Sequence, residues 1–541
     1  MKVCLLYEDR EWTKEEKYYD SASIIQDLGL KALFLVAAKR LIYENGAVKG
    51  LEEEDVYLTE TLRSVMMIPL CSKEEIEYRH EIIKDSLSHE DFIRGLYTVS
   101  CELFDKWNEL GRGPKEKKQQ SNPVVRLMTD IREITLFCNT LSKIKTMMGQ
   151  QEEDFSSKGL RTFRDGLFSS FSDEREENIR RVLADISFYT DRIDQIDERR
   201  AEVNRPRIVL ECGLEDGLKF SSLKLEEVSS QNSKFLNKGS IKYKIQEFID
   251  SRIPDSFSTV QDPRISDQAH ELEYMIVSYL VEGLKWFMEE FRDFFDKLKF
   301  QSAFYLSVIQ LEQQMRRFGI QWCFPKVCDR RDLEFDDLKE FVMGIEQRTK
   351  PVGNTCSIKK KDLLIVTGAN QGGKSTFLRS IGIAQVMMQC GLMVAAQSYS
   401  SGIFPRIFVH FTRREDSAMN SGRLDEELNR MNKIVERIGD GSLLLLNESF
   451  ATTTEKEGSV IAYDIIKALT EAGVRILTVT HLLSFAKRVY EESKEQPESN
   501  TEFFSAERKA NGTRTYRMIQ HEPELTSFGL DLYEEIVEKK R

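Results

Sequence analysis

The sequence contains little proline and no long apolar run. Only 11 of its 541 residues are proline, and none lies between Pro263 and Pro325. This scarcity is typical of a helix-rich globular protein and excludes the collagen-like and proline-rich disordered classes. No stretch reaches the about 18–20 apolar residues that span a bilayer, and the N-terminal residues lack a full signal-peptide core. We therefore expect a cytoplasmic protein with no membrane partner.

Cysteine is scarce as well. The nine cysteines are scattered without paired spacing, so we expect reduced thiols rather than disulfides. Cys323 and Cys328 are the closest pair, and no second pair stands near them to complete a tetrahedral zinc site. Zinc is therefore not expected.

The sequence also lacks a surplus of basic residues. The net charge is −12, and residues 351–541 hold 25 Lys and Arg against 25 Asp and Glu, so the acidic excess lies in residues 1–350. A broad basic face for DNA is not visible in this distribution. Residues 111–126 are a local basic exception. Their glycines and prolines favour a solvated linker, and a patch that contacts phosphates is the alternative.

Apolar residues at helical spacing dominate the first 345 residues. They predict an N-terminal helical segment over residues 1–110 that leads into a helical core and lever domain over residues 111–345. Residues 263–325 predict one long helix, or two with a short break. A continuous helix of about 45 residues would extend about 68 Å, the length of an arm. Over residues 207–238 the helical pattern weakens, and short apolar runs favour strands of a small insertion.

From about residue 346 to residue 541 the pattern changes to short apolar runs alternating with helical ones, which predicts a parallel α/β sheet. One buried strand, residues 362–367, runs directly into a phosphate-binding (Walker A) loop. The residues expected to hold a nucleotide are those of the loop and the first helical turn: Gly368, Ala369, Asn370, Gln371, Gly372, Gly373, Lys374, Ser375 and Thr376.

Each residue type in this loop has a chemical reason to be there. Glycines let the backbone N–H groups turn inward around the β- and γ-phosphates of ATP, and Lys374 supplies a cation to them. The hydroxyl of Ser375 is a ligand for Mg²⁺. A helix that begins near Lys374 directs its positive end at the same phosphates. We therefore expect ATP and Mg²⁺ as cofactors.

Two further strands end in residues suited to hydrolysis. The run Leu443–Leu446 is followed by Asn447 and Glu448, where P-loop ATPases usually have Asp and Glu. Glu448 can polarise the attacking water, whereas the neutral Asn447 offers Mg²⁺ only a carbonyl oxygen, so we expect slow hydrolysis. A third strand, residues 474–479, ends at Thr480 and His481, and we interpret His481 as a sensor of the γ-phosphate.

These motifs resemble the ATPase domain of the MutS mismatch-repair family. The resemblance rests on the phosphate loop with its Asn370, on Asn447 and Glu448 followed by Thr452–Thr454 and Glu457-Gly458, on Thr480-His481, and on Ser527-Phe528-Gly529. A weaker match, Cys71 to Arg79, is similar to the helix that opens the core domain of that family. The family resemblance implies a multidomain fold, in which an all-α core and lever arm precedes an α/β P-loop NTPase domain of the ABC-type ATPase class.

The resemblance also implies an active site shared between two subunits. In the family a serine-rich signature segment of one subunit reaches the γ-phosphate held by the other, and Ser421-Gly422 with Glu426 is the best candidate here, in a register that can slip by one residue. A helix cap is the simpler reading of Ser421 and is compatible with this role. We expect a homodimer through the ATPase domains, with residues 452–458 crossing to the partner.

The sequence departs from mismatch-reading members of the family. Nothing in the first 70 residues resembles their Phe-x-Glu wedge, and Phe287-Met288-Glu289 lies on the packed stripe of a helix. No C-terminal extension or nuclease-like tail is expected. We therefore expect a MutS-like dimeric ATPase clamp on branched or non-specific duplex DNA, acting in repair or recombination without mismatch reading. The alternative is an ATP-binding assembly or ribosome-associated factor with weak hydrolysis. A transporter or chromosome-structuring ATPase fits poorly, because the helical part precedes the phosphate loop.

Overall fold

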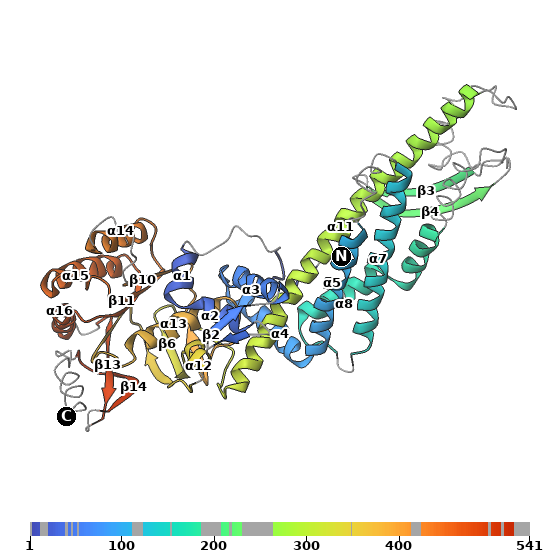
Figure 1. Ribbon diagram of the computed structural model, residues 1–541. Helices are drawn as coiled ribbons and strands as arrows, with labels where there is room; N and C mark the ends of the chain where they lie inside the picture. The colour runs from blue at the N-terminus through green and yellow to red at the C-terminus, as the bar shows by residue number, and fades with distance from the viewer. Residues whose placement is uncertain are drawn as a thin grey trace. The chain divides into compact units, whose positions relative to one another are not determined.

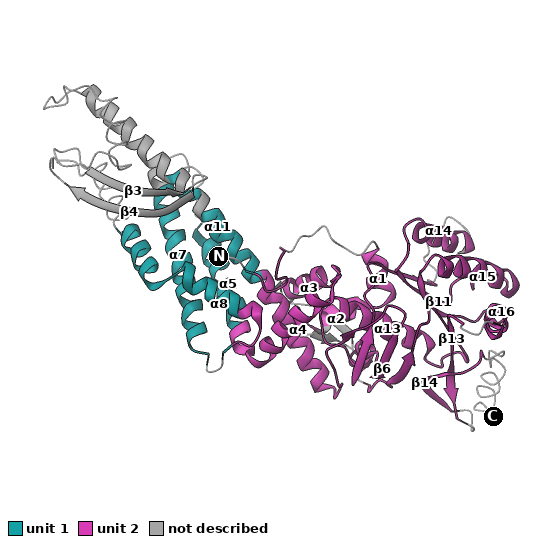
Figure 2. Cartoon of the chain, turned by 180° about the vertical axis from the view of Figure 1, so that it is seen from behind, with its two compact units in different colours: residues 1–3, 94–154, 161–299 teal, residues 4–93, 155–160, 300–541 magenta. Residues whose placement is uncertain are grey.

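The computed structural model describes most of the chain. The described residues are 3–10, 20–37, 42–44, 47–50, 53–110, 123–151, 154–184, 207–215, 219–229, 263–347, 349–412, 423–495, 499–509 and 513–523. The chain forms two compact units (Figure 2): unit 1 comprises residues 1–3, 94–154 and 161–299, and unit 2 comprises residues 4–93, 155–160 and 300–541. The sequence-based division at residues 110 and 345 stays a prediction.

Unit 1 is helical, with one β-hairpin. The elements that lie in it wholly or in large part are α5 (Glu90–Leu110), α7 (Pro123–Gly149), α8 (Lys158–Ser170), a helix over residues 173–184, β3 (Arg207–Glu215), β4 (Lys219–Ser229) and α11 (Pro263–Arg317) as far as Lys299. The antiparallel β3–β4 hairpin lies in the range whose fold the sequence left open between helix and the strands of a small insertion.

The long helix predicted from the proline-free stretch is a single helix. α11 has 55 residues and is therefore about 82 Å long at 1.5 Å per residue. Two phenylalanines of α11 pack in the core of unit 1: Phe291 and Phe295 both stack on Phe137 of α7, with ring centroids 5.5 and 5.6 Å away. These aromatic side chains are structural, as the sequence pattern indicated.

Within the described residues, unit 2 combines helices with a six-stranded sheet, a four-stranded sheet and the β1–β2 pair (Figure 1). Its helices are α1 (Ser21–Asp27), α2 (Leu30–Val36), α3 (Glu53–Met66), α4 (Lys73–Ser88), α12 (Phe341–Gln347), α13 (Lys374–Gln389), α14 (Arg423–Val435), α15 (Glu455–Glu471) and α16 (Leu483–Lys494). Its strands are β1 (Ile42–Glu44), β2 (Ala47–Gly50), β5 (Lys326–Val327), β6 (Leu333–Leu338), β7 (Asn354–Ile358), β8 (Leu363–Thr367), β9 (Ser398–Ser401), β10 (Ile407–Phe411), β11 (Leu443–Asn447), β12 (Arg475–Val479), β13 (Thr501–Arg508) and β14 (Arg514–Gln520).

The larger sheet of unit 2 has six strands in the order β10-β11-β12-β8-β13-β14. All neighbours are parallel except β13 and β14, which form an antiparallel pair. A four-stranded sheet has the order β5-β9-β6-β7. Three of its strands come before the six-stranded sheet in the chain, and β9 lies between β8 and β10. Strands β1 and β2 form a separate pair. The chain is thus helical in its N-terminal region and ends in an α/β region, as the sequence predicted. The antiparallel β13–β14 pair and the mixed four-stranded sheet differ from the parallel sheet that was expected.

Both faces of the six-stranded sheet are covered, which explains its continuous apolar strands. Leu444 and Leu446 of β11 belong to a core cluster with residues of α15 and α16. Leu445, which points to the other face, approaches Gly382 of α13 so closely that a Cβ on this glycine would collide with its side chain. α13 therefore packs on one face, and α15 and α16 pack on the other.

None of the helices within the described ranges combines the length and apolar character needed to cross a lipid bilayer.

Candidate nucleotide-binding site

The segment from Gly368 to Thr376 joins the carboxyl end of β8 to the first turn of α13. The φ angles of Gly368 and Gly373 are 112° and 94°, in a region that side chains disfavour. A Cβ on Gly372 would lie 2.9 Å from the carbonyl oxygen of Ala369. The backbone path of this loop therefore requires glycine at three positions, as the phosphate-loop pattern predicts.

Lys374 opens α13, and its side chain turns back over the loop. Its Nζ donates hydrogen bonds to the carbonyl oxygens of Gly368 and Ala369, at 2.8 and 2.9 Å, and the residue is only 4% exposed. Asn370 and Gln371 are exposed, whereas Ser375 and Thr376 are half-buried in the first helical turn. An anion in this loop would meet a cation and the positive end of a 16-residue helix.

Parallel pairing brings the other expected residues to the same edge of the sheet. β12 lies between β8 and β11, and Val479 of β12 pairs with both Val366 and Asn447. Gly368, Glu448 and the Thr480-His481 pair follow directly on these three strands. They therefore lie along the carboxyl edge of the sheet, where α/β proteins of this kind bind ligands.

A hydrogen bond joins Glu448 to His481 at this edge. His481 Nε2 lies 2.8 Å from Glu448 Oε1, and Nε2 donates because an ionised carboxylate only accepts. This bond is the main cause that lowers the pKa of Glu448 below its ordinary value; burial opposes it, and the charge of Lys374 adds to it. The carboxylate of Glu448 is thus held ionised and oriented.

Asn447 presents an oxygen that nothing in the described part of the chain satisfies. Its Oδ1 is buried and has no hydrogen-bond partner there. Its backbone carbonyl accepts from Thr412 N at 3.1 Å. A buried carbonyl oxygen without a donor costs free energy unless a ligand occupies it.

The donor set at this edge fits Mg²⁺ that arrives with phosphates. The orphaned Asn447 oxygen, the Ser375 hydroxyl and the Glu448 carboxylate are all oxygen donors, the type that Mg²⁺ prefers. Within the described ranges there is no cluster of three or more His, Cys, Asp or Glu side chains that could hold a metal by itself. A nucleotide in the loop would supply further oxygens to such a cation.

Other expected site residues are not brought to this edge by the described structure. Ser421 and Gly422 lie outside the described residues, as does Ser527-Phe528-Gly529. Glu426 is half-buried on α14, whereas its neighbour Glu427 is 5% exposed and accepts hydrogen bonds from the loop that follows Glu448.

The helical spacing of the sequence indicates that Glu427 is buried, although no motif includes this residue. Glu427, Met431 and Ile434 are spaced by four and three residues and are all buried on α14. A carboxylate on the buried stripe of a helix needs a partner, because an unpaired buried charge is costly.

A second set of residues that the sequence did not indicate comes from β14. Arg514 Nη1 donates to Gln371 Oε1 at 3.2 Å, and the backbone of Tyr516 lies against Gly373. Tyr516 is half exposed and has a φ of 61°, an uncommon value for a tyrosine. The antiparallel hairpin of β13 and β14 therefore borders the phosphate loop.

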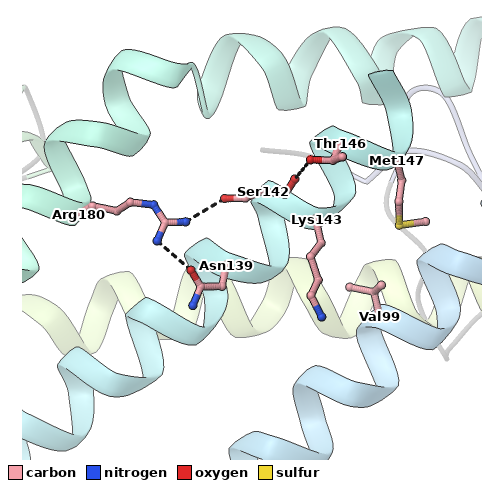
Figure 3. A pocket seen from close by; sticks show the side chains of 7 residues that line it. All are labelled: Val99, Asn139, Ser142, Lys143, Thr146, Met147 and Arg180. Carbon is pink, nitrogen blue, oxygen red and sulfur yellow. Dashed lines mark hydrogen bonds between the residues drawn. The ribbon is translucent and has the colours of Figure 1, made fainter. Parts of the chain in front are cut away.

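Unit 1 carries a shallow hollow of about 430 Å³, shown in Figure 3. Arg180 donates there to Asn139 Oδ1 at 2.8 Å and to Ser142 Oγ at 3.1 Å. Lys143 is paired with Glu102 at 3.3 Å. These polar groups satisfy one another, and we assign the hollow no function.

The edge of the six-stranded sheet thus combines what phosphoryl transfer needs. It offers a backbone cradle with a lysine, oxygen donors for a divalent cation, and an oriented carboxylate that can polarise water. This chemistry is that of nucleoside triphosphate binding and hydrolysis.

Comparison with known families assigns both parts of the chain. The family model for MutS domain V matches residues 364–537, and the model for the MutS2 N-terminal domain matches residues 72–318. The first range contains the phosphate loop, Glu448 and His481, and the second contains the helices that showed the weaker resemblance.

Similar curated proteins carry related names. The chain is 27% identical over 223 residues to "Endonuclease MutS2" of Carboxydothermus hydrogenoformans, an alignment that covers 40% of this chain and 28% of that protein. It is 35% identical over 122 residues to "DNA mismatch repair protein MutS" of Thermotoga sp. (strain RQ2), covering 23% of this chain and 15% of that protein. It is 34% identical over 135 residues to "MutS protein homolog 4" of Mus musculus, covering 25% and 14%. The chain thus spans less than a third of the length of these relatives.

Proposed function

The chain belongs to the MutS family, and from this we propose that it is an ATP-dependent DNA-binding ATPase that works in DNA repair or recombination. The observation that supports ATP hydrolysis most strongly is the shared edge of Lys374, Glu448 and His481 in unit 2. Nucleotide binding alone would not require an oriented carboxylate beside the phosphate cradle.

Each residue then has a defined role. The loop from Gly368 to Thr376 binds the β- and γ-phosphates through backbone N–H groups, and Lys374 neutralises their charge. Ser375 and Asn447, with Glu448 nearby, would hold Mg²⁺, which when bound draws charge from the phosphate oxygens. Glu448 polarises the attacking water, and His481 keeps the carboxylate ionised and in place.

We further propose a homodimer that joins through the ATPase domains. Ser421 of one subunit would complete the site of the other, and closure on ATP would move the helical arms around DNA. The relatives named for mismatch repair support DNA as the partner, and the expectation for this chain is branched or non-specific duplex DNA. Reading of mismatches is not part of the proposal.

One observation favours a second candidate function. Asn447 is neutral at the position where P-loop ATPases usually place Asp, which weakens the hold on Mg²⁺. An ATP-binding assembly or ribosome-associated factor that hydrolyses ATP slowly would use such a site. It would bind its partner in the ATP state without requiring DNA.

Salt-dependent binding to branched DNA, measured with and without ATP, separates these functions. The DNA-clamp proposal predicts binding that strengthens at low salt and changes with ATP. Lys374→Ala should retain the salt dependence and lose the response to ATP. Binding that ignores both salt and nucleotide would remove the DNA clamp and leave the assembly factor.

A further inference from the structure

The loop that follows β11 has an unfavourable backbone conformation. Glu448 and Phe450 have φ angles of 56° and 66°, although neither is glycine. Side chains in this left-handed region cost free energy, and they persist only where the surrounding contacts fix them. The direction of the Glu448 carboxylate therefore depends on what holds the residues immediately after it.

Glu427 on α14 holds this loop with both carboxylate oxygens. Its Oε1 accepts from Phe450 N at 2.7 Å, and its Oε2 accepts from Thr452 Oγ1 at 2.6 Å. The residue is 5% exposed. Hydrogen bonds to a carboxylate are stronger than neutral ones, so this pair of contacts fixes the loop on both sides of Ala451.

His410 also connects α14 to the loop that follows β11. His410 on β10 is fully buried, and its Nδ1 lies 2.7 Å from Ser449 Oγ. Ser449 Oγ in turn donates to the His410 carbonyl oxygen at 2.9 Å. The His410 ring also reaches the Glu427 carbonyl oxygen through Nε2 at 3.3 Å. The Glu427 side chain thus holds Phe450 and Thr452, and His410, whose ring contacts the backbone carbonyl oxygen of Glu427, holds Ser449.

α15 leaves the loop no room to shift toward it. A Cβ on Gly458 would overlap the carbonyl oxygen of Phe450, so the helix backbone already lies against the loop. Thr454 caps α15 by accepting from Glu457 N at 3.4 Å. The loop therefore lies between the backbone of α15 and the side chain of Glu427. A substitution of Glu427 removes its hydrogen bonds to the loop and leaves the backbone contact with α15 unchanged.

We propose that Glu427 is a positioning residue for ATP hydrolysis, which fixes the Phe450–Thr452 backbone and thereby aims the Glu448 carboxylate at the nucleotide. This inference rests on the proposed ATPase function.

The test compares variants of Glu427 and Thr452 in the full-length protein. ATP affinity, single-turnover hydrolysis and melting temperature are measured for each. Glu427→Ala should slow hydrolysis about tenfold or more, because small misplacement of a reacting group is costly, while ATP affinity stays that of the wild type. Glu427→Gln should recover most of the rate, since its amide oxygen can accept from Phe450 N and its amide nitrogen can donate to the Thr452 hydroxyl.

Two further variants define the controls. Thr452→Val should slow hydrolysis in the same direction, and adding it to Glu427→Ala should cost little more, because the two residues act as one unit. Glu436→Ala, an exposed carboxylate just beyond the other end of α14, should hydrolyse ATP at the wild-type rate.

The outcomes distinguish this inference from the proposed function. Wild-type hydrolysis in both Glu427→Ala and Thr452→Val overturns the positioning role. Equal losses of ATP affinity, rate and melting temperature, without rescue by Glu427→Gln, also overturn it and assign Glu427 to the fold alone. If Glu427→Ala does not fold, Thr452→Val decides. A wild-type protein that binds ATP and never hydrolyses it refutes the ATPase itself.

Discussion

Nε2 of His481 lies 2.8 Å from Oε1 of Glu448, although the two residues are 33 positions apart in the chain. The contact follows from the topology, because β11 and β12 are neighbouring parallel strands and each residue follows the end of its strand. Its electrostatic consequence is a lowered pKa of Glu448, with the hydrogen bond from His481 as the largest cause. We therefore propose that the histidine acts on hydrolysis through the carboxylate as well as through contact with phosphate.

The first prediction concerns pH. Glu448 must be ionised to polarise water, so a lowered pKa extends hydrolysis to more acidic solutions. His481→Ala removes the main lowering cause and leaves burial, which raises the pKa. The acidic limb of the rate profile should then move to higher pH. The measurement is hydrolysis at saturating ATP across the acidic range, and a limb that stays in place would contradict the role of this hydrogen bond.

The second prediction concerns the phosphate cradle. Lys374→Ala should abolish ATP binding, because the phosphates lose the cation that is held over the loop. Fluorescent ATP titration measures this directly. Lys487→Ala, which removes an exposed lysine of α16, is the matched control and should bind ATP like the wild type. Unchanged affinity in Lys374→Ala would reject the loop assignment.

The third prediction concerns Asn447. Its buried Oδ1 has no hydrogen-bond partner among the described residues, so the side chain can change without breaking a contact of that oxygen. Asn447→Asp should place a carboxylate at the cation position, raise the rate of hydrolysis and lower the Mg²⁺ concentration that is needed. Hydrolysis is measured in a Mg²⁺ titration. If neither quantity changes, the metal does not depend on this position.

The fourth prediction concerns the packing of α15. Gly458→Ala should destabilise the fold by about 1–3 kcal/mol, because the added methyl group overlaps the Phe450 carbonyl oxygen and forces the backbones apart. Gly439→Ala is the matched control, since a Cβ there meets no atom within 4 Å. Denaturant unfolding should leave the control near wild type. Equal stability of both variants would contradict the close approach of α15 to the loop.

Local sequence patterns predicted the elements that carry the phosphate loop. The apolar runs that became β8, β11 and β12 are fully enclosed by helices on both faces, and such strands are recognisable as short runs of Leu, Ile and Val. The long helix α11 was recognisable because its apolar spacing continues without proline. The phosphate-loop spacing indicated Lys374, and the places directly after β11 and β12 indicated Glu448 and His481, whose roles stay predictions.

Contacts between distant segments could not be read from local patterns. The approach of β14 to the phosphate loop joins Arg514 to Gln371 across 143 positions, and only the complete sheet order creates it. The motif spacing predicts Glu426 for the signature segment, in a register that can slip by one residue. On a helix such a shift turns a side chain by about 100°, which here separates a half-buried position from a buried one.

We propose that this chain binds ATP and pairs with a second copy of itself. Sedimentation of the Glu448→Ala variant, which should bind ATP and fail to hydrolyse it, tests both properties at once. We expect a stable dimer when ATP is added and a smaller dimer fraction without it. A protein that remains monomeric in every nucleotide state and shows no affinity for ATP would refute the proposal.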